Sequence, residues 1–345
     1  MIRLPAFDYV APRTLGDAVK HLADLGHDAM LVAGGTDVFP NMKRGQFEPK
    51  VLIGLRGIRE LVGVGANGGG VRIGAGTTLS AVAAHPQLAR RYAAVATAAG
   101  LVSSPQLRNA GTLGGNVCVD TRCNYYNQSY EWRKAVGFCM KKDGDICLVA
   151  PGSDRCWAVS SSDTAPALWA AGASARLVGP AGERTVPVSA LFRDDGIEYL
   201  AKRRDEILTE LVLPPADGWD SVYLKLRRRG SFDFPVLGVA VALRREGDVV
   251  REARIVLGAV ASTPREASAA AAALIGERLT SETITRAAEA AAGPAKPLDN
   301  TDFTHPYRKR LVRVYVARAL ARLAGLDAGP EGRPGSSGRP PSITT

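Results

Sequence analysis

The sequence lacks several features that would each assign the protein to a particular setting. No run of eighteen apolar residues occurs, so we expect no membrane-spanning helix and no membrane partner. The opening segment, MIRLPAFDYVAPRTL, has no long apolar run, so we expect no secretory signal peptide. Cysteine is scarce, and its count of five is odd. These observations favour a cytoplasmic protein whose thiols stay reduced, and they argue against structural disulfides.

Positive charge is in excess but is not concentrated in one place. Lys and Arg total 44 against 34 Asp and Glu, a net charge of +10. Local excesses occur near the C-terminus, in YRKRLVRVYVARALARL, and around the cysteines. No helix-turn-helix, zinc-finger or RNA-binding signature accompanies them, so we expect no nucleic-acid partner.

The chain divides into units with different patterns of predicted helix and strand, and the predicted fold class is α+β. Residues 1–60 form an α/β unit, and residues 61–216 form a second unit that carries the cysteines in an insertion at about 118–160, the cysteine segment. Residues 217–326 contain strands followed by helices, which indicates a separate α+β domain. Residues 327–345 are rich in Gly, Pro and Ser, so a disordered tail is expected.

Local signals place several elements within these units. A helix in TLGDAVKHLADLG should begin after Thr14 and end at Gly26, before the strands AMLVAG and VLIGL. TLSAVAAHPQLARRYAAVATAAG is a helical stretch. GVGANG matches the dinucleotide fingerprint G-x-G-x-x-G, but Asn67-Gly68 is a hairpin turn signal and no helix follows it. We therefore do not expect a Rossmann dehydrogenase.

Two glycine-rich loops have the composition of phosphate-binding turns. AGGTD, at residues 33–37, follows a predicted strand, and GTLGGN occupies residues 111–116. Glycine lets backbone N–H groups approach a phosphate without obstruction by a Cβ atom. Neither loop continues into the Gly-Lys-Ser/Thr of a Walker motif. Two such loops in separate units suit a dinucleotide held between them, although each loop alone is compatible with an ordinary turn.

Four of the five cysteines lie well inside the cysteine segment, at Cys123, Cys139, Cys147 and Cys156, and Cys118 lies at its start. They form no Cys-x-x-Cys pair and have no histidine among them, which is unusual for zinc. Iron–sulfur clusters also take cysteine thiolates. The residues alone leave iron–sulfur, zinc and unligated thiols open. Cys118 lies on an apolar turn and is predicted to be a packed thiol.

Six short sequences in order give a more specific interpretation: AGGTD, RIGAGTTLSAV, RNAGTLGGNV, SSDTAPAL, YLKLRRRGSFDFPVLGVAVAL and IVLGAVASTPREA. Together they resemble the FAD-binding medium subunits of the molybdenum hydroxylase (xanthine dehydrogenase) family, over residues 1 to about 325. The resemblance implies a two-subdomain FAD-binding fold of the PCMH type, followed by a C-terminal domain of sheet plus helices. The cysteine segment, with DTRCNYYNQSYEWR, resembles that of the 4-hydroxybenzoyl-CoA reductase β subunits.

The resemblance implies roles for individual residues. The first loop would hold the FAD pyrophosphate, the second would line the other half of that site, Asp163 would bind ribityl or ribose hydroxyls, and Lys225 would lie near the isoalloxazine edge. Asp163 could instead cap a helix, and Lys225 could face solvent. The implied FAD residues are Val32, Ala33, Gly34, Gly35, Thr36, Asp37, Thr112, Gly115, Asn116, Asp163 and Lys225, and the implied [4Fe–4S] ligands are Cys123, Cys139, Cys147 and Cys156.

The resemblance also implies a function in which this chain relays electrons and carries no catalytic residue of its own. Its partners would be a large subunit with the molybdenum cofactor and a small subunit with two [2Fe–2S] clusters, in a dimer of heterotrimers. In the reductase, ferredoxin would supply electrons for dehydroxylation of 4-hydroxybenzoyl-CoA, and the basic surface would suit an acidic ferredoxin. The alternatives are another molybdenum hydroxylase, acting on an aromatic or N-heterocyclic substrate, and a flavin-binding scaffold with a structural zinc.

Overall fold

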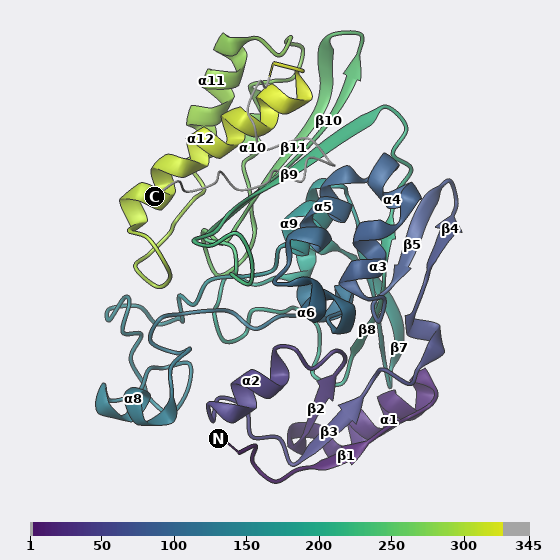
Figure 1. Ribbon diagram of the computed structural model, residues 1–345, viewed down its shortest axis with the longest axis vertical. Helices are drawn as coiled ribbons and strands as arrows, with labels where there is room; N and C mark the ends of the chain where they lie inside the picture. The colour runs from purple at the N-terminus through teal and green to yellow at the C-terminus, as the bar shows by residue number, and fades with distance from the viewer. Residues whose placement is uncertain (1–2, 327–345) are drawn as a thin grey trace, which may run out of the picture.

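The structure is a computed structural model that describes residues 3–326, and it contains three sheets stacked along the long axis of the molecule (Figure 1). The N-terminal sheet is parallel and has the order β1-β3-β2. It consists of β1 (Asp8–Val10), β2 (Ala29–Val32) and β3 (Val51–Gly54), with helices α1 (Leu15–Leu25) and α2 (Val38–Lys43). As predicted, Thr14 caps α1, because its side chain accepts a hydrogen bond from the Asp17 N–H, and Gly26 ends the helix.

The middle sheet is antiparallel and has the order β4-β5-β8-β6-β7. Its strands are β4 (Val64–Asn67), β5 (Gly70–Gly74), β6 (Ser174–Gly179), β7 (Gly182–Pro187) and β8 (Ile207–Leu213). Helices near it are α3 (Leu79–Ala84), α4 (Pro86–Arg91), α5 (Ala93–Leu101), α6 (Pro105–Ala110), α7 (Leu113–Val117) and α9 (Thr164–Ala170).

The C-terminal sheet, with order β12-β11-β10-β9, is also antiparallel. Its strands are β9 (Trp219–Leu226), β10 (Leu237–Glu246), β11 (Val249–Gly258) and β12 (Arg265–Glu266), with α10 (Ser268–Ala272), α11 (Ser281–Ala291) and α12 (His305–Leu323).

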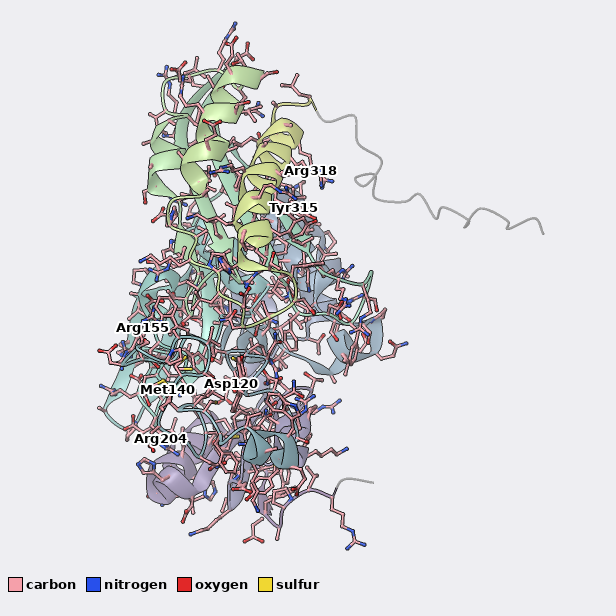
Figure 2. The ribbon with its side chains drawn as sticks, turned by 90° about the vertical axis from the view of Figure 1, so that its left-hand side faces the viewer. Asp120, Met140, Arg155, Arg204, Tyr315 and Arg318 are labelled. Carbon is pink, nitrogen blue, oxygen red and sulfur yellow. The ribbon has the colours of Figure 1, made fainter. Side chains whose placement is uncertain are left out.

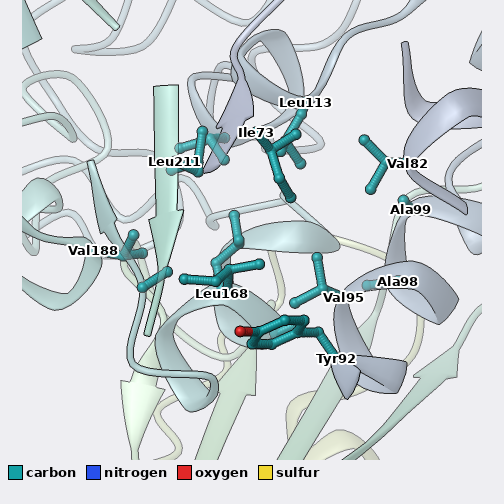
Figure 3. Packing of buried hydrophobic residues seen from close by; sticks show 14 of the residues in the cluster. Ile73, Val82, Tyr92, Val95, Ala98, Ala99, Leu113, Leu168, Val188 and Leu211 are labelled. Atoms are coloured by element: carbon teal, nitrogen blue, oxygen red, sulfur yellow. The ribbon is translucent and has the colours of Figure 1, made fainter. Parts of the chain in front are cut away.

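Apolar cores lie in all three units, and the largest one extends into the C-terminal sheet at Tyr223, Ala240 and Val256. The largest core joins the middle sheet to its helices, where Ile73, Val95, Leu113 and Leu168 are completely buried (Figure 3). A second core lies between β10, β11 and helices α10 to α12. The proposed domain boundaries, near residues 60 and 216, fall between the three sheets. The structure therefore has the predicted α+β class, with sheet and helix in every unit.

Two local expectations differ from the structure. The predicted helical stretch from Thr78 is split into α3, α4 and α5, because Pro86 disfavours helical backbone at His85 and Tyr92 interrupts the next turn. The hairpin between β4 and β5 turns at Gly68-Gly69, one residue later than expected, with φ of +51° and +81°.

The cysteine segment forms a lobe beside the N-terminal and C-terminal units, and its one helix is α8 (Tyr130–Ala135) (Figure 1). Its two ends meet, since the N–H and C=O groups of Arg122 and Val159 exchange hydrogen bonds of 2.8 and 2.7 Å. None of the helices within residues 3–326 combines the length and apolar character needed to cross a bilayer. The predicted disordered tail, residues 327–345, lies outside the described residues.

Candidate functional site

The two glycine loops lie against each other, although they belong to different units. A Cβ atom on Gly34 would lie 2.1 Å from the carbonyl oxygen of Ala110 and 2.9 Å from the Cα atom of Gly111. A Cβ atom on Gly111 would in turn lie 3.4 Å from Oγ1 of Thr36. The close approach therefore depends on the absence of a side chain at Gly34, and it brings the predicted halves of one site together.

The first loop presents a row of unused backbone donors. Val32 ends β2, and its carbonyl accepts a hydrogen bond from the Leu55 N–H. Among residues 3–326, no group accepts a hydrogen bond from the N–H groups of residues 33–37. Gly35 is buried and has a φ of +70°, a left-handed conformation that favours glycine. Buried donors need partners, and consecutive N–H groups in such a turn form an anion-binding concavity, so the loop fits a pyrophosphate.

The second loop is organised differently from the first. The N–H groups of Leu113, Gly114, Gly115 and Asn116 all donate within the chain, to oxygens of Thr77, Ala75 and Thr112. Thr112 caps α7 through its side chain, and Gly115 is exposed. The expectation that this loop repeats the backbone chemistry of the first loop is therefore wrong. The second loop instead packs closely against the first loop, through Gly111 and the preceding Ala110.

Asn116 connects the second loop to Asp163. Its Oδ1 atom accepts hydrogen bonds from the Ser162 hydroxyl at 3.0 Å, the Thr164 hydroxyl at 2.7 Å and the Thr164 N–H at 3.1 Å. All of these groups are buried. Asn116 thus fixes the turn that carries Asp163, which explains why the two predicted site residues occur together.

Asp163 and Lys225 form a buried ion pair. Oδ2 of Asp163 lies 2.8 Å from Nζ of Lys225, and the two side chains are 3% and 1% exposed. The Tyr223 hydroxyl donates to Oδ1 of Asp163 at 2.8 Å, and Lys225 also donates to the Leu101 carbonyl. Burial raises the pKa of Asp163 and lowers that of Lys225, while their attraction opposes both shifts. Asp163 makes no helix-capping hydrogen bond, and Lys225 does not face solvent, so both simpler alternatives are wrong.

The four cysteines of the cysteine segment form a second candidate site. Cys123, Cys139, Cys147 and Cys156 are all buried, and all are free thiols. Cys123 lies near Cys139 and Cys156, and Cys156 lies near Cys147. Backbone N–H groups point at the sulfurs, as in the 3.4 Å contact from Ala158 N to Cys156 Sγ. Burial raises the pKa of Cys123 to about 12 and that of Cys156 to about 11, so these thiols are neutral unless a cation displaces their protons.

The spacing of the thiols is relevant to the type of metal. Within residues 3–326, no three side chains of His, Cys, Asp or Glu converge closely enough to hold one metal ion. A tetrahedral zinc ion needs four donors within about 2.3 Å of a single point. Cys118 lies apart from this group and packs at the edge of the large core, as predicted.

The cysteine segment is attached to the body by buried polar side chains that the sequence analysis did not identify. Arg133 is completely buried, and its guanidinium donates to the carbonyls of Arg44 and Gly45 and pairs with Asp143. Lys141 is buried as well, and its Nζ atom lies 2.7 Å from Oδ1 of Asp120 (the region of Asp120, Met140 and Arg155 in Figure 2). The sequence carries no signal for these anchors, because Arg, Lys and Asp side chains are almost never fully buried unless paired.

Comparisons with known proteins agree with the arrangement of the units. Residues 5–216 match the family described as the FAD binding domain in molybdopterin dehydrogenase. Residues 221–323 match the CO dehydrogenase flavoprotein C-terminal domain. The chain is 32% identical to the carbon monoxide dehydrogenase medium chain of Hydrogenophaga pseudoflava, over 92% of this chain and 96% of that one.

Two further similarities support the same grouping. The aldehyde oxidoreductase FAD-binding subunit PaoB of Escherichia coli is 31% identical, over 79% of this chain and 86% of that subunit. A solved structure of the H. pseudoflava carbon monoxide dehydrogenase superposes with a TM-score of 0.77, covering 92% of this chain and 97% of that one. The chain therefore belongs to the FAD-binding medium subunits of the molybdenum hydroxylase family.

Proposed function

We propose that this chain is the FAD-carrying electron-relay subunit of a cytoplasmic molybdenum hydroxylase. The observation that carries the proposal is the first glycine loop, whose unused N–H groups lie directly against the second loop. Bound FAD would supply a centre that exchanges one or two electrons. A large subunit with the molybdenum cofactor and a small subunit with two [2Fe–2S] clusters would complete the enzyme, as a dimer of heterotrimers.

The residues of this chain would hold and orient the flavin. The N–H groups of residues 33–37 would bind the pyrophosphate, and Thr112, Gly115 and Asn116 would close the other side. Asp163 would accept hydrogen bonds from ribityl or ribose hydroxyls, near the isoalloxazine edge at Lys225. Because Lys225 and Tyr223 already hold Asp163 in one position, its carboxylate would be pre-oriented and would not need to reorganise on binding.

We propose that the four thiols of the cysteine segment hold a [4Fe–4S] cluster. A cubane attaches each thiolate to a different iron atom, so its ligands lie farther apart than those of one zinc ion. Four buried free thiols in one loop segment, three of them packed in one apolar cluster and no histidine among them, supply the ligand type that such a cluster takes. The N–H group of Ala158, directed at Cys156, would stabilise thiolate charge.

The thiol group favours a second, narrower candidate function: the β subunit of a 4-hydroxybenzoyl-CoA reductase, with ferredoxin as the electron donor. The relatives described above are carbon monoxide and aldehyde oxidoreductases, so the broader assignment has the stronger support. The charge argument for ferredoxin is also weaker than the sequence indicated. Arg133 and Lys141 are buried in ion pairs and cannot form part of a docking surface.

The test is anaerobic purification with the natural partner subunits, followed by flavin, iron and zinc analysis and EPR of the reduced protein. One FAD per chain supports the relay function, and its absence in the intact complex would overturn that function. Four irons beyond those of the small subunit, lost in Cys139→Ser and retained in Cys118→Ser, support the cluster. Zinc in place of iron, with FAD still bound, would overturn the cluster and would show a flavin subunit with a structural zinc site. Activity with 4-hydroxybenzoyl-CoA then distinguishes the reductase from other molybdenum hydroxylases.

A further inference from the structure

Arg122 occupies the point where three parts of the molecule meet. Its guanidinium pairs with the carboxylate of Asp37, at the end of the first glycine loop, and lies 3.3 Å from Oδ1 of Asn41 in α2. Its Cζ atom lies 4.1 Å above the ring of Phe234, which belongs to the C-terminal unit. Arg122 directly precedes Cys123, and its backbone N–H and C=O groups bond to those of Val159 at the other end of the cysteine segment. Among residues 3–326, no other hydrogen bond or ion pair joins the first loop to the cysteine segment.

The position of Arg122 has an electrostatic consequence for the loop. A carboxylate at Asp37 lies next to the N–H groups that would bind a pyrophosphate, and an unpaired negative charge there would repel phosphate oxygens. The side-chain amide of Asn41 also donates to the Asp37 carboxylate at 2.9 Å. The Asp37 side chain makes no capping hydrogen bond to α2. The guanidinium of Arg122 neutralises the Asp37 carboxylate. The Nε–H group of the same guanidinium is buried and has no hydrogen-bond partner among residues 3–326. The cation that balances the loop is therefore supplied by the cysteine segment.

We propose that Arg122 is a positioning residue that couples the two cofactor sites, so that filling the thiol site tightens FAD binding. The inference rests on the proposed function, since it requires both sites to be real. A filled thiol site fixes Cys123 and hence the backbone of Arg122, which holds the Asp37 side chain and the loop in their binding arrangement. Because coupling between two binding sites is reciprocal, bound FAD would equally strengthen retention of the metal.

The experiment measures the Kd for FAD by quenching of flavin fluorescence, with the thiol site filled by iron and sulfide or stripped by a chelator under anaerobic conditions. The full chain is used throughout. In the wild type, stripping should weaken FAD binding about 10-fold, within the usual range of coupling between sites. In Arg122→Gln, FAD binding should be weak in both states, with the effect of stripping reduced below about twofold.

A matched control is Arg155→Gln, which removes another cation from the cysteine segment beside Cys156. Arg155 pairs with Asp194 at 3.0 Å and does not contact the first loop, so wild-type coupling is expected. If Arg122→Gln fails to fold by circular dichroism, Asp37→Asn removes the other half of the pair and should also reduce the effect of stripping. Wild-type coupling in either folded variant would overturn the inference alone. A wild-type chain that binds no FAD would overturn the proposed function as well.

Discussion

Oδ2 of Asp163 lies 2.8 Å from Nζ of Lys225, and both side chains are almost completely removed from solvent. The pair links the turn before α9 to β9, so it joins the middle unit to the C-terminal sheet. Tyr223 adds a hydrogen bond from the same strand. A site residue predicted to bind the flavin is therefore also a fixed joint between two units.

Removing one partner of this pair should be costly. Lys225→Met leaves an uncompensated buried carboxylate at Asp163, and we expect a loss of about 3–5 kcal/mol in the free energy of unfolding. The measurement is denaturant unfolding of the FAD-free chain. Lys50→Met removes the exposed partner of Asp28 and should cost less than about 1 kcal/mol. Equal losses in the two variants would show that Asp163 is not effectively buried in solution.

Adding one methyl group to the first loop should separate the two loops. In Gly34→Ala, the new Cβ atom would meet the Ala110 carbonyl at 2.1 Å, so the loops must move apart. We expect FAD content to fall at least about 10-fold, since a misplaced binding group loses most of its hydrogen bonds. Gly230→Ala is the control, because its Cβ atom would enter open space. Normal FAD content in Gly34→Ala would contradict the placement of the site at this junction.

Arg133 should hold the cysteine segment to the body. Arg133→Met removes the donor to the Arg44 and Gly45 carbonyls and leaves Asp143 paired with Lys142 alone. Because the two carbonyls lose their donor, we expect faster limited proteolysis within the segment and a loss of about 1–3 kcal/mol in the free energy of unfolding. Lys134→Gln changes the adjacent, exposed position and should behave as the wild type does. Unchanged cleavage in Arg133→Met would show that the other anchors suffice.

Glu206 should make the protein sensitive to acid. Its buried carboxylate accepts from Arg184 at 2.7 and 2.8 Å, and these hydrogen bonds hold its pKa below the usual 4.5. A depressed pKa means that the unfolded chain binds the proton more readily, so this stabilisation is present above pH 4.5 and is lost as pH falls below it. The difference in unfolding free energy between the wild type and Glu206→Gln should be about 2 kcal/mol at neutral pH and should shrink in acid.

A parallel measurement on Glu289→Gln, an exposed position in α11, gives the baseline for that comparison. We expect a change within about 0.5 kcal/mol at every pH. A difference between the wild type and Glu206→Gln that stays constant from neutral pH into acid would exclude the proposed role of the carboxylate charge.

The sequence predicted the elements whose signals are local. Thr14 and Gly26 mark the ends of α1, and the Gly-rich turn near residue 68 forms the hairpin that rules out a dinucleotide fingerprint. These features depend on a few neighbouring residues, whose backbone preferences are readable in order. Of the two breaks in the helical stretch, the one at His85 follows from Pro86, but the one at Tyr92 was harder to predict, because the Tyr92 hydroxyl donates to the distant Pro214 carbonyl.

The contacts that organise the candidate sites could not be read from the sequence alone. Asp163 and Lys225 were each assigned to the flavin site by resemblance, but nothing local indicated that they pair with each other. Arg122 and Lys141 belong to a charge-rich stretch that resembles a solvated surface, yet both side chains are buried. Their partners lie in other units, so only the folded arrangement brings them together.

The hydrogen-bonded pair Arg122 and Val159 has a further consequence for how the fold accommodates the cysteine segment. The chain leaves the body and returns to it at one point, so the distance between the two ends does not depend on what lies between them. Lengthening such a loop adds little to the entropy of closure. Changes in the length of the cysteine segment therefore leave the positions of its two ends, and of the units that they join, unaltered.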